Sequence, residues 1–250
     1  MGLMMIPDFL IVVAMKAGTG SLWTYLCNHP DIHPATLRME QNGKKGWLKE
    51  TSYFGYNVHE FTEDDYRYLF KYKKKGQLTF EASTEYFTYP GTPERIFEAN
   101  PRCKIIILAR NPIDRAWSHY WHEVIYTKEE DLPFEQAIQR PLKTGFDHFH
   151  YNYLDTGYYI KHIERWAKLF PKKQVMIFDF HKFVERPEDI FRTILQWLGV
   201  KDGTIGEYKV INKGVYTEKM SDSTREVLIE HYRPYNKELY KLIGTGLGWA

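Results

Sequence analysis

A short run of small residues between two apolar segments is the first feature of this chain that could do chemistry. The residues from Lys16 to Ser21 read KAGTGS. Small side chains let backbone N–H groups come close to an anion, and the N-terminus of a following helix adds partial positive charge. Lys16 adds a full positive charge at the start of the run. The pattern therefore predicts a loop that binds a phosphate-like group.

The common phosphate-binding loops do not match this run. A nucleotide-triphosphate loop reads G-x-x-x-x-G-K-[ST], whereas Lys16 stands before Gly18 and no lysine precedes Ser21. A dinucleotide fingerprint, G-x-G-x-x-G, does not follow the first apolar segment either. The loop must serve another anionic ligand or bind it in another way.

A second group of polar residues follows the apolar run Lys104–Leu108. Arg110 comes after this predicted strand, and Ser118 lies eight residues further on, in a helix that Asn111 would cap. Arg115 and Ser118 are three residues apart and share a helical face. A guanidinium and a hydroxyl near a strand end can hold a phosphate dianion. An ordinary ion pair and a buried hydroxyl would explain them too, but the loop at Lys16 favours the ligand.

These two motifs carry a resemblance to a known family. KAGTGSL, from Lys16 to Leu22, resembles the 5′-phosphosulfate loop of sulfotransferases that use 3′-phosphoadenosine 5′-phosphosulfate (PAPS). IIILARNPIDRAWSHYWH, from Ile105 to His122, resembles their 3′-phosphate motif. The resemblance covers most of the chain and is closer to the heparan-sulfate and bacterial branch than to the cytosolic phenol and steroid branch. Further matching segments are Glu81-Ala82-Ser83, Gly157-Tyr158, Phe170–Leu198 and Asn212-Lys213-Gly214.

The resemblance implies an enzyme that moves a sulfuryl group from PAPS to an acceptor, leaves 3′-phosphoadenosine 5′-phosphate (PAP) and needs no metal. Lys16 would stabilise negative charge on the departing phosphate. The residues implied to bind the nucleotide are Lys16, Ala17, Gly18, Thr19, Gly20, Ser21, Leu22, Arg110, Ser118, Lys213 and Gly214. For Lys213 and Gly214 a plain turn is an equal alternative.

The same resemblance implies a general base. An acceptor hydroxyl or amine must lose a proton as it attacks. The segment Lys49–Phe54 (KETSYF) resembles a Lys-Glu-x-x-aromatic-Phe motif whose glutamate would be Glu50. His119 and His122 are weaker candidates, because they lie inside the helix of the 3′-phosphate motif. Many heparan-sulfate enzymes have a lysine where this chain has Ala82, which argues against a polysaccharide acceptor.

Composition agrees with a folded protein and a small anionic ligand. Among 250 residues, 43% are hydrophobic and 26% are charged, so intrinsic disorder is not expected. The formal net charge is only +2, which argues against a nucleic-acid partner. There are 2 cysteines and no C-x-x-C, so a disulfide framework and a thiolate zinc site are excluded and a reducing, cytoplasmic compartment is expected.

The N-terminal apolar run Ile6–Ala14 predicts a buried strand. Asp8 interrupts it, no basic segment precedes it, and it is much shorter than the roughly 20 apolar residues of a membrane span. We therefore expect neither a signal peptide nor a membrane partner.

Strand and helix patterns alternate along the chain. This order predicts an α/β fold, one domain over residues 1–250 with a central parallel β-sheet flanked by helices, and the resemblance implies the P-loop-kinase-like sulfotransferase form. Pro30–Leu48 looks irregular. Predicted strands are Phe9–Ala14, Leu78–Ser83, Lys104–Leu108 and Val175–Phe180, and predicted helices are Leu22–Leu26, Thr62–Lys71, one beginning at Thr92, Asn111–Trp121, Tyr158–Phe170, Pro187–Leu198 and Ser221–Ile243, the last broken by Pro234.

Three alternatives to a small-molecule sulfotransferase remain open on the sequence. One is a P-loop-like nucleotide kinase, which would depend on magnesium. The second is a carbohydrate sulfotransferase that acts on a polysaccharide, and the third is a nucleotide-binding module without activity. The acceptor is expected to be a small molecule, its identity and the choice between O- and N-sulfation are open, and so is the oligomeric state.

Overall fold

The computed structural model describes residues 7–39, 45–57, 59–140, 150–203, 208 and 214–249. Of the residues in the matched motifs above, Asn212 and Lys213 lie outside the described residues.

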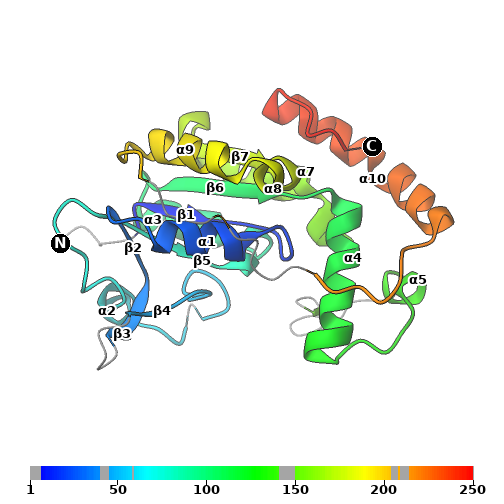
Figure 1. Ribbon diagram of the computed structural model, residues 1–250, viewed down its shortest axis with the longest axis horizontal. Helices are drawn as coiled ribbons and strands as arrows, with labels where there is room; N and C mark the ends of the chain where they lie inside the picture. Colours follow the sequence, from blue (N-terminus) through cyan, green and yellow to red (C-terminus); the bar gives the residue numbers. More distant parts are fainter. Residues whose placement is uncertain are drawn as a thin grey trace.

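A five-stranded parallel sheet forms the centre of the molecule (Figure 1). Its strand order is β2-β5-β1-β6-β7, and every neighbouring pair is parallel. The predicted α/β fold with a central parallel sheet is thereby confirmed. The strands are β1 (Phe9–Ile11), β2 (Ile32–Pro34), β5 (Leu78–Ala82), β6 (Lys104–Ala109) and β7 (Val175–Asp179).

The stretch Pro30–Leu48, expected to be irregular, contains strands. It supplies the edge strand β2 and an antiparallel pair, β3 (Thr36–Met39) and β4 (Lys45–Trp47). These strands are 3 or 4 residues long, too short for a period-2 pattern to stand out in the sequence. Pairing with β5, and not local propensity, makes β2 a strand.

Helices cover both faces of the sheet. The side chains of α3, α7 and α10 pack on one face, and those of α1, α8 and α9 pack on the other. None of the helices within the described ranges is long and apolar enough to cross a membrane. The helices are α1 (Thr19–Cys27), α2 (Glu63–Tyr68), α3 (Thr92–Ala99), α4 (Pro112–His122), α5 (Phe134–Ala137), α7 (Tyr159–Leu169), α8 (Phe180–Glu185), α9 (Pro187–Leu198) and α10 (Asp222–Ile243), with a π-helical turn η2 at Glu123–Thr127 and a 3₁₀ turn η1 at Thr84–Phe87.

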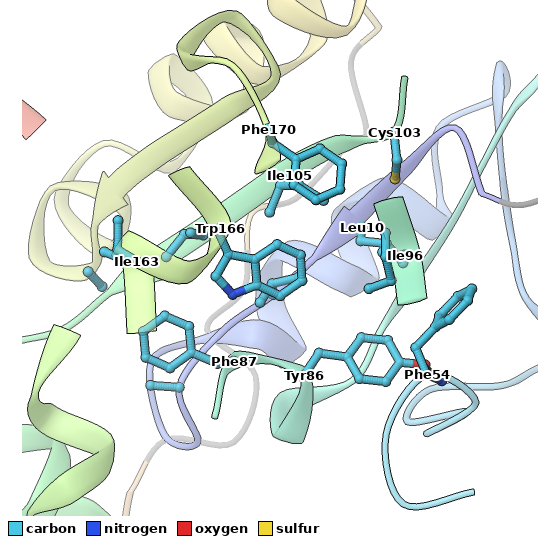
Figure 2. Close-up of a cluster of buried hydrophobic side chains, with 14 of the residues drawn as sticks. Leu10, Phe54, Tyr86, Phe87, Ile96, Cys103, Ile105, Ile163, Trp166 and Phe170 are labelled. Atoms are coloured by element: carbon cyan, nitrogen blue, oxygen red, sulfur yellow. Dashed lines mark hydrogen bonds between the residues drawn. The ribbon is translucent and has the colours of Figure 1, made fainter. Parts of the chain in front are cut away.

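Alternate residues of the strands feed two separate cores. Leu10 and Ile105 face the α3–α7 side, where the Trp166 indole lies among them (Figure 2). Their neighbours Ile11 and Ile106 face the α1–α9 side. This alternation follows from the pleat of a strand that is buried on both faces, and it explains the continuous apolar runs seen in the sequence.

The helix caps follow the predicted signals, but α1 begins at Thr19 and not at Leu22, α2 ends at Tyr68 and not at Lys71, and one further prediction was wrong. Thr62 caps α2 in a reciprocal pair with Asp65, and Asn111 caps α4 by accepting a hydrogen bond from the Ile113 N–H at 3.0 Å. Pro234, however, does not break α10, which is continuous through it. Burial of Tyr232 and Leu239 on either side of the proline offsets the lost backbone hydrogen bond.

The predicted site residues follow the carboxyl ends of the three middle strands. Lys16 follows β1 and Arg110 follows β6, while the Glu50 N–H donates to the carbonyl of Ala82 at the end of β5 at 2.9 Å. After β1, the chain forms β2 and β5 on one side of β1. It then forms β6 and β7 on the other side. Ligands of open parallel sheets bind at the carboxyl edge where the strand order reverses in this way.

Candidate active site

The loop after β1 has a conformation that requires glycine at one position. Lys16 and Gly18 both have positive φ, 69° and 91°. A Cβ on Gly18 would lie 2.8 Å from the ring of Phe180, which begins α8. Gly18 is therefore needed both for its backbone angle and for the close approach of the Phe180 ring.

The first turn of α1 presents backbone donors. The helix begins at Thr19 with Gly18 as its N-cap, and no side chain in the described part of the protein caps it. The amide groups of the first turn are thus available to an anion, and the helix adds partial positive charge there. Thr19, Ser21 and Leu22 are buried, so this turn is fixed in the core and not free to rearrange.

Arg110 is tied to the same loop. One of its guanidinium NH₂ groups donates to the Lys16 carbonyl at 2.9 Å, and the guanidinium stands 4.9 Å from the centre of the Phe180 ring. Its backbone N–H donates to the Tyr159 hydroxyl at 3.1 Å. Its Nε is buried and has no hydrogen-bond partner among the described residues. Arg110 is therefore held in place with a donor left over for a ligand.

Ser118 is brought to Arg110 as expected, and both meet a residue that the sequence analysis missed. Ser118 is buried on α4, and the Tyr216 hydroxyl hydrogen-bonds to it and to Arg110. Burial raises the pKa of Tyr216, but these hydrogen bonds and the cations of Arg110 and Lys16 outweigh it and lower the pKa. A phenol oxygen stabilised by two cations marks this spot as a place for negative charge.

Tyr216 comes from the late segment that the resemblance singled out. Gly214 packs against the Tyr216 ring so closely that it has no room for a Cβ. The sequence signal for Tyr216 was its position two residues after the matched Lys213-Gly214 pair. Nothing in the local pattern showed that its side chain would turn back onto α4.

The Lys16 ammonium is partly buried between groups of both charge signs. Its Nζ is 3.4 Å from the Nδ1 of His122 on α4. Burial lowers the pKa of Lys16, and Arg110 lowers it further, while Tyr216 and Glu123 oppose the shift. Lys16 thus stands between the loop and α4, beside the other predicted nucleotide-binding groups.

Glu50 is held at the end of β5. Its φ is 61°, and one carboxylate oxygen accepts from the backbone N–H of Thr84 at 2.6 Å and from the Thr84 hydroxyl at 3.1 Å. The other oxygen pairs with the Lys49 ammonium. Burial lowers the pKa of Lys49 to about 8, although the nearby Glu85 carboxylate opposes the shift. The contacts fix the orientation of Glu50.

A small cavity lies near Lys16 and Glu50. Its volume is about 20 Å³, which is room for about one water molecule or one polar group. Met15, the residue before Lys16, and Thr84, which holds Glu50, both line it. Lys16 and Glu50 thus each have a neighbour in this cavity, although neither of them lines it.

A buried carboxylate supports the Glu50 segment. Glu81, at the end of β5, accepts hydrogen bonds from the hydroxyls of Tyr66 at 2.9 Å, Tyr86 at 2.7 Å and Thr51, next to Glu50. Burial raises the pKa of Glu81 to about 7, although the three hydroxyls act against the shift. Glu81 belonged to a matched segment, but its role as an anchor was not visible in the sequence.

Arg115 does not accompany Ser118 at the predicted phosphate site. Its side chain is fully buried and donates to the backbone carbonyls of Met15, at 3.4 Å, and Tyr153. It therefore stabilises the segment that leads into Lys16. Two residues three positions apart on a helix are offset by about 60°, enough for one to face the interior and the other the ligand.

Histidines surround a second buried carboxylate, Glu123, at the start of the π-helical turn. Its oxygens lie 2.8 Å from the Nδ1 of His150 and 3.5 Å from the Nε2 of His119. Hydrogen bonds from these histidines and Thr127 overcome burial and lower the pKa of Glu123 to about 2. The described residues contain no group of three or more acidic, histidine or cysteine side chains placed to hold a metal ion.

Comparison with known sequences identifies the family. The family described as the sulfotransferase domain matches residues 6–233. The chain is 27% identical over 268 residues to mouse heparan sulfate glucosamine 3-O-sulfotransferase 3B1, covering 98% of this chain and 65% of that protein. It is also 27% identical to the Xenopus laevis bifunctional heparan sulfate N-deacetylase/N-sulfotransferase 1, covering 95% of this chain and 30% of that protein. It therefore spans less than two thirds of the length of these two relatives.

Comparison with solved structures points the same way. A sulfotransferase from Alicyclobacillus acidocaldarius superposes with a TM-score of 0.79 and 30% identity, covering 96% of each chain. A mouse sulfotransferase solved with PAP shares the fold with a TM-score of 0.50 and 16% identity, covering 79% of this chain and 59% of that one. The predicted anion-binding loop, the sheet that carries it and these two comparisons lead to one conclusion: the chain belongs to the sulfotransferase family.

Proposed function

We propose that this protein transfers a sulfuryl group from PAPS to a hydroxyl or amine of an acceptor and releases PAP. One observation carries the proposal. Lys16, Arg110 and the uncapped first turn of α1 lie together at the carboxyl edge of the sheet, and Arg110 keeps a buried donor without a partner in the described ranges. Such a set of donors suits a ligand with more than one anionic group.

The residues present fit the two anionic ends of this nucleotide. The amides of the first turn of α1 and the Lys16 ammonium suit the phosphosulfate. Arg110 and Ser118, which share the Tyr216 hydroxyl, suit the 3′-phosphate. The family membership and the PAP-bound structural neighbour support the same nucleotide. Gly214 lies beside Tyr216, so the late segment is also at this end.

The chemistry then divides between two residues. Bound PAPS supplies an activated sulfuryl group: the acceptor atom bonds to sulfur, the bridging S–O bond breaks, and its electron pair stays on the phosphate. Lys16 stabilises the charge that develops on that phosphate oxygen. Glu50 takes the proton that the acceptor loses, held by Thr84 in one orientation.

For the acceptor we propose a small molecule. The names of the relatives point to glucosamine units of heparan sulfate, which makes a carbohydrate the second candidate. Against a polyanionic polymer stands Ala82, where many heparan-sulfate enzymes have a lysine. Alanine carries no charge, so this position supplies no cation. We also propose a reducing, cytoplasmic location, which the buried free thiols of Cys27 and Cys103 support.

The test compares two variants on two acceptors. Calorimetry with PAP first establishes nucleotide binding. Lys16→Ala should then lower turnover on an aliphatic alcohol and on an acidic phenol alike. Glu50→Gln should lower turnover on the alcohol by about 10²–10⁴-fold, the usual value of a positioned base, but spare the phenol that is already ionised. Full turnover of Glu50→Gln on the alcohol would remove Glu50 as the base.

Excess chelator separates this function from the kinase alternative. Sulfuryl transfer assisted by Lys16 and backbone amides should continue in EDTA. Loss of activity in EDTA, with recovery on adding magnesium, would favour a kinase-like phosphoryl transfer.

A further inference from the structure

The cavity beside Met15 is lined mainly by residues with polar groups in their side chains. Three threonines line it, Thr84, Thr88 and Thr156, together with Tyr56. His119 lines it too, and burial lowers the pKa of His119 to about 4, so its imidazole is neutral at pH 7. The remaining polar residue in the lining is a carboxylate, Glu85.

Glu85 is buried with part of its hydrogen-bonding capacity unused. Only 5% of the residue is exposed. The Ser52 hydroxyl hydrogen-bonds to its carboxylate, whereas its Oε1 is buried and has no hydrogen-bond partner among the described residues. Gly55 makes room for this oxygen, since a Cβ there would lie 2.8 Å from Oε1. A buried carboxylate oxygen of this kind is costly unless a donor meets it.

The nearest cation does not supply that donor. Lys49 is close enough to act on the pKa of Glu85, which burial raises and Lys49 lowers. Its ammonium, however, pairs directly with Glu50. The neutral His119 brings no positive charge. The cavity therefore presents a carboxylate that lacks a directly bonded cation in the described structure.

Aromatic rings stand beside this carboxylate. The Tyr56 ring is 40% exposed and lies 4.7 Å from the ring of Tyr89. The pKa of Tyr56 is raised mainly by burial and also by the nearby Glu85 and Tyr89. Tyr56 is therefore close to Glu85. A carboxylate, a tyrosine ring and hydroxyl groups together form the set that binds an ammonium group.

We propose that this cavity is an acceptor subsite in which Glu85 binds an ammonium group, so that the acceptor is a small cationic amine or amino alcohol. The proposal rests on the sulfotransferase function above. Its cavity is lined by Met15, the residue before Lys16, and by Thr84, which holds Glu50 by hydrogen bonds. A volume of about 20 Å³ admits one such group while the rest of the acceptor stays outside. An anionic polymer would meet repulsion from Glu85.

The test uses two small probes of similar shape, 2-aminoethanol and ethylene glycol. Their binding to the whole protein is measured by saturation-transfer NMR at pH 7, with and without PAP. The wild-type protein should bind 2-aminoethanol about tenfold more tightly than the glycol, as expected for a hydrogen bond to a charged group. Glu85→Gln keeps the shape and should abolish this preference, while calorimetry shows unchanged PAP affinity.

Two further variants isolate the cause. Tyr56→Leu should weaken the binding of 2-aminoethanol but not that of the glycol. Tyr56 is partly exposed, so this substitution should not prevent folding. Glu98→Gln, an exposed glutamate on α3, should change neither. Equal binding of both probes to the wild-type protein, or a preference that survives in Glu85→Gln, would overturn the proposal. Failure of PAP to bind would instead overturn the sulfotransferase function. The two outcomes can be told apart, because the binding of the two probes is also measured without PAP.

Discussion

The guanidinium of Arg110 donates a hydrogen bond to the backbone carbonyl of Lys16 at 2.9 Å. The residue assigned to the 3′-phosphate thus also holds the loop assigned to the phosphosulfate. The two predicted motifs are 94 residues apart in sequence and form one unit in the fold. A change at Arg110 should therefore be felt at both ends of the nucleotide.

Arg110→Ala should weaken PAP binding by roughly 2–4 kcal/mol, because a charge-assisted contact to the phosphate is lost. The same variant should bind adenosine 5′-phosphosulfate, which lacks the 3′-phosphate, with a smaller loss of affinity. That smaller loss measures the effect of removing the hydrogen bond from Arg110 to the Lys16 carbonyl. Calorimetry with both ligands measures the difference, with Arg102→Ala at an exposed arginine as the control. Equal losses for both ligands would show that Arg110 acts only on the loop.

Gly18→Ala should be more damaging than Gly76→Ala. Both glycines have positive φ, 91° and 88°, so both variants carry the same backbone cost, about 1–2 kcal/mol. A Cβ meets nothing within 4 Å at Gly76 but meets the Phe180 ring at 2.8 Å at Gly18. In Gly18→Ala, overpacking should lower the free energy of unfolding, measured in urea, by about a further 1–3 kcal/mol and should also reduce the affinity for PAP. Similar losses in the two variants would contradict the contact with Phe180.

Tyr216→Phe should tighten PAP binding about fivefold. The hydroxyl of Tyr216 occupies Arg110 and Ser118, and one hydrogen bond is worth about 1 kcal/mol net. In the wild-type protein, absorbance titration should reveal a tyrosine with a lowered pKa that is missing from the variant. Tyr68→Phe, at an exposed tyrosine of α2, is the control. Weaker PAP binding in Tyr216→Phe would mean that the hydroxyl contacts the phosphate instead.

Glu81 should make the protein less stable as pH rises from about 4.5 to about 7. Its pKa is raised in the folded state, so the folded protein holds a proton that the unfolded chain releases within this window. Wild type should lose up to about 3 kcal/mol of unfolding free energy across the window, at about 1.4 kcal/mol per pKa unit. Glu81→Gln should lose less unfolding free energy between pH 4.5 and pH 7.5, as measured by urea unfolding at both values. Identical pH dependence would show that Glu81 is not the group responsible.

Strong local sequence signals were sufficient to predict many of the strands and helices. Continuous apolar runs predicted β1, β6 and β7, because a strand buried on both faces does not alternate. Asn111-Pro112 predicted the start of α4, because an Asn cap followed by Pro at the first helical position satisfies the free end of a helix. Strand β2 was missed since its pairing with β5 is set by distant residues.

The sequence by itself determined which chemical groups are present at the sheet edge. Lys16, Gly18, Arg110 and Ser118 were all predicted, since motif spacing along a strand, loop and helix is a local property. The tertiary structure alone decided what these groups touch. It turned Arg115 inward onto backbone carbonyls and folded the late segment back onto α4. It also gathered side chains from separate loops around Glu85. Such contacts depend on packing between distant segments, which no local pattern records.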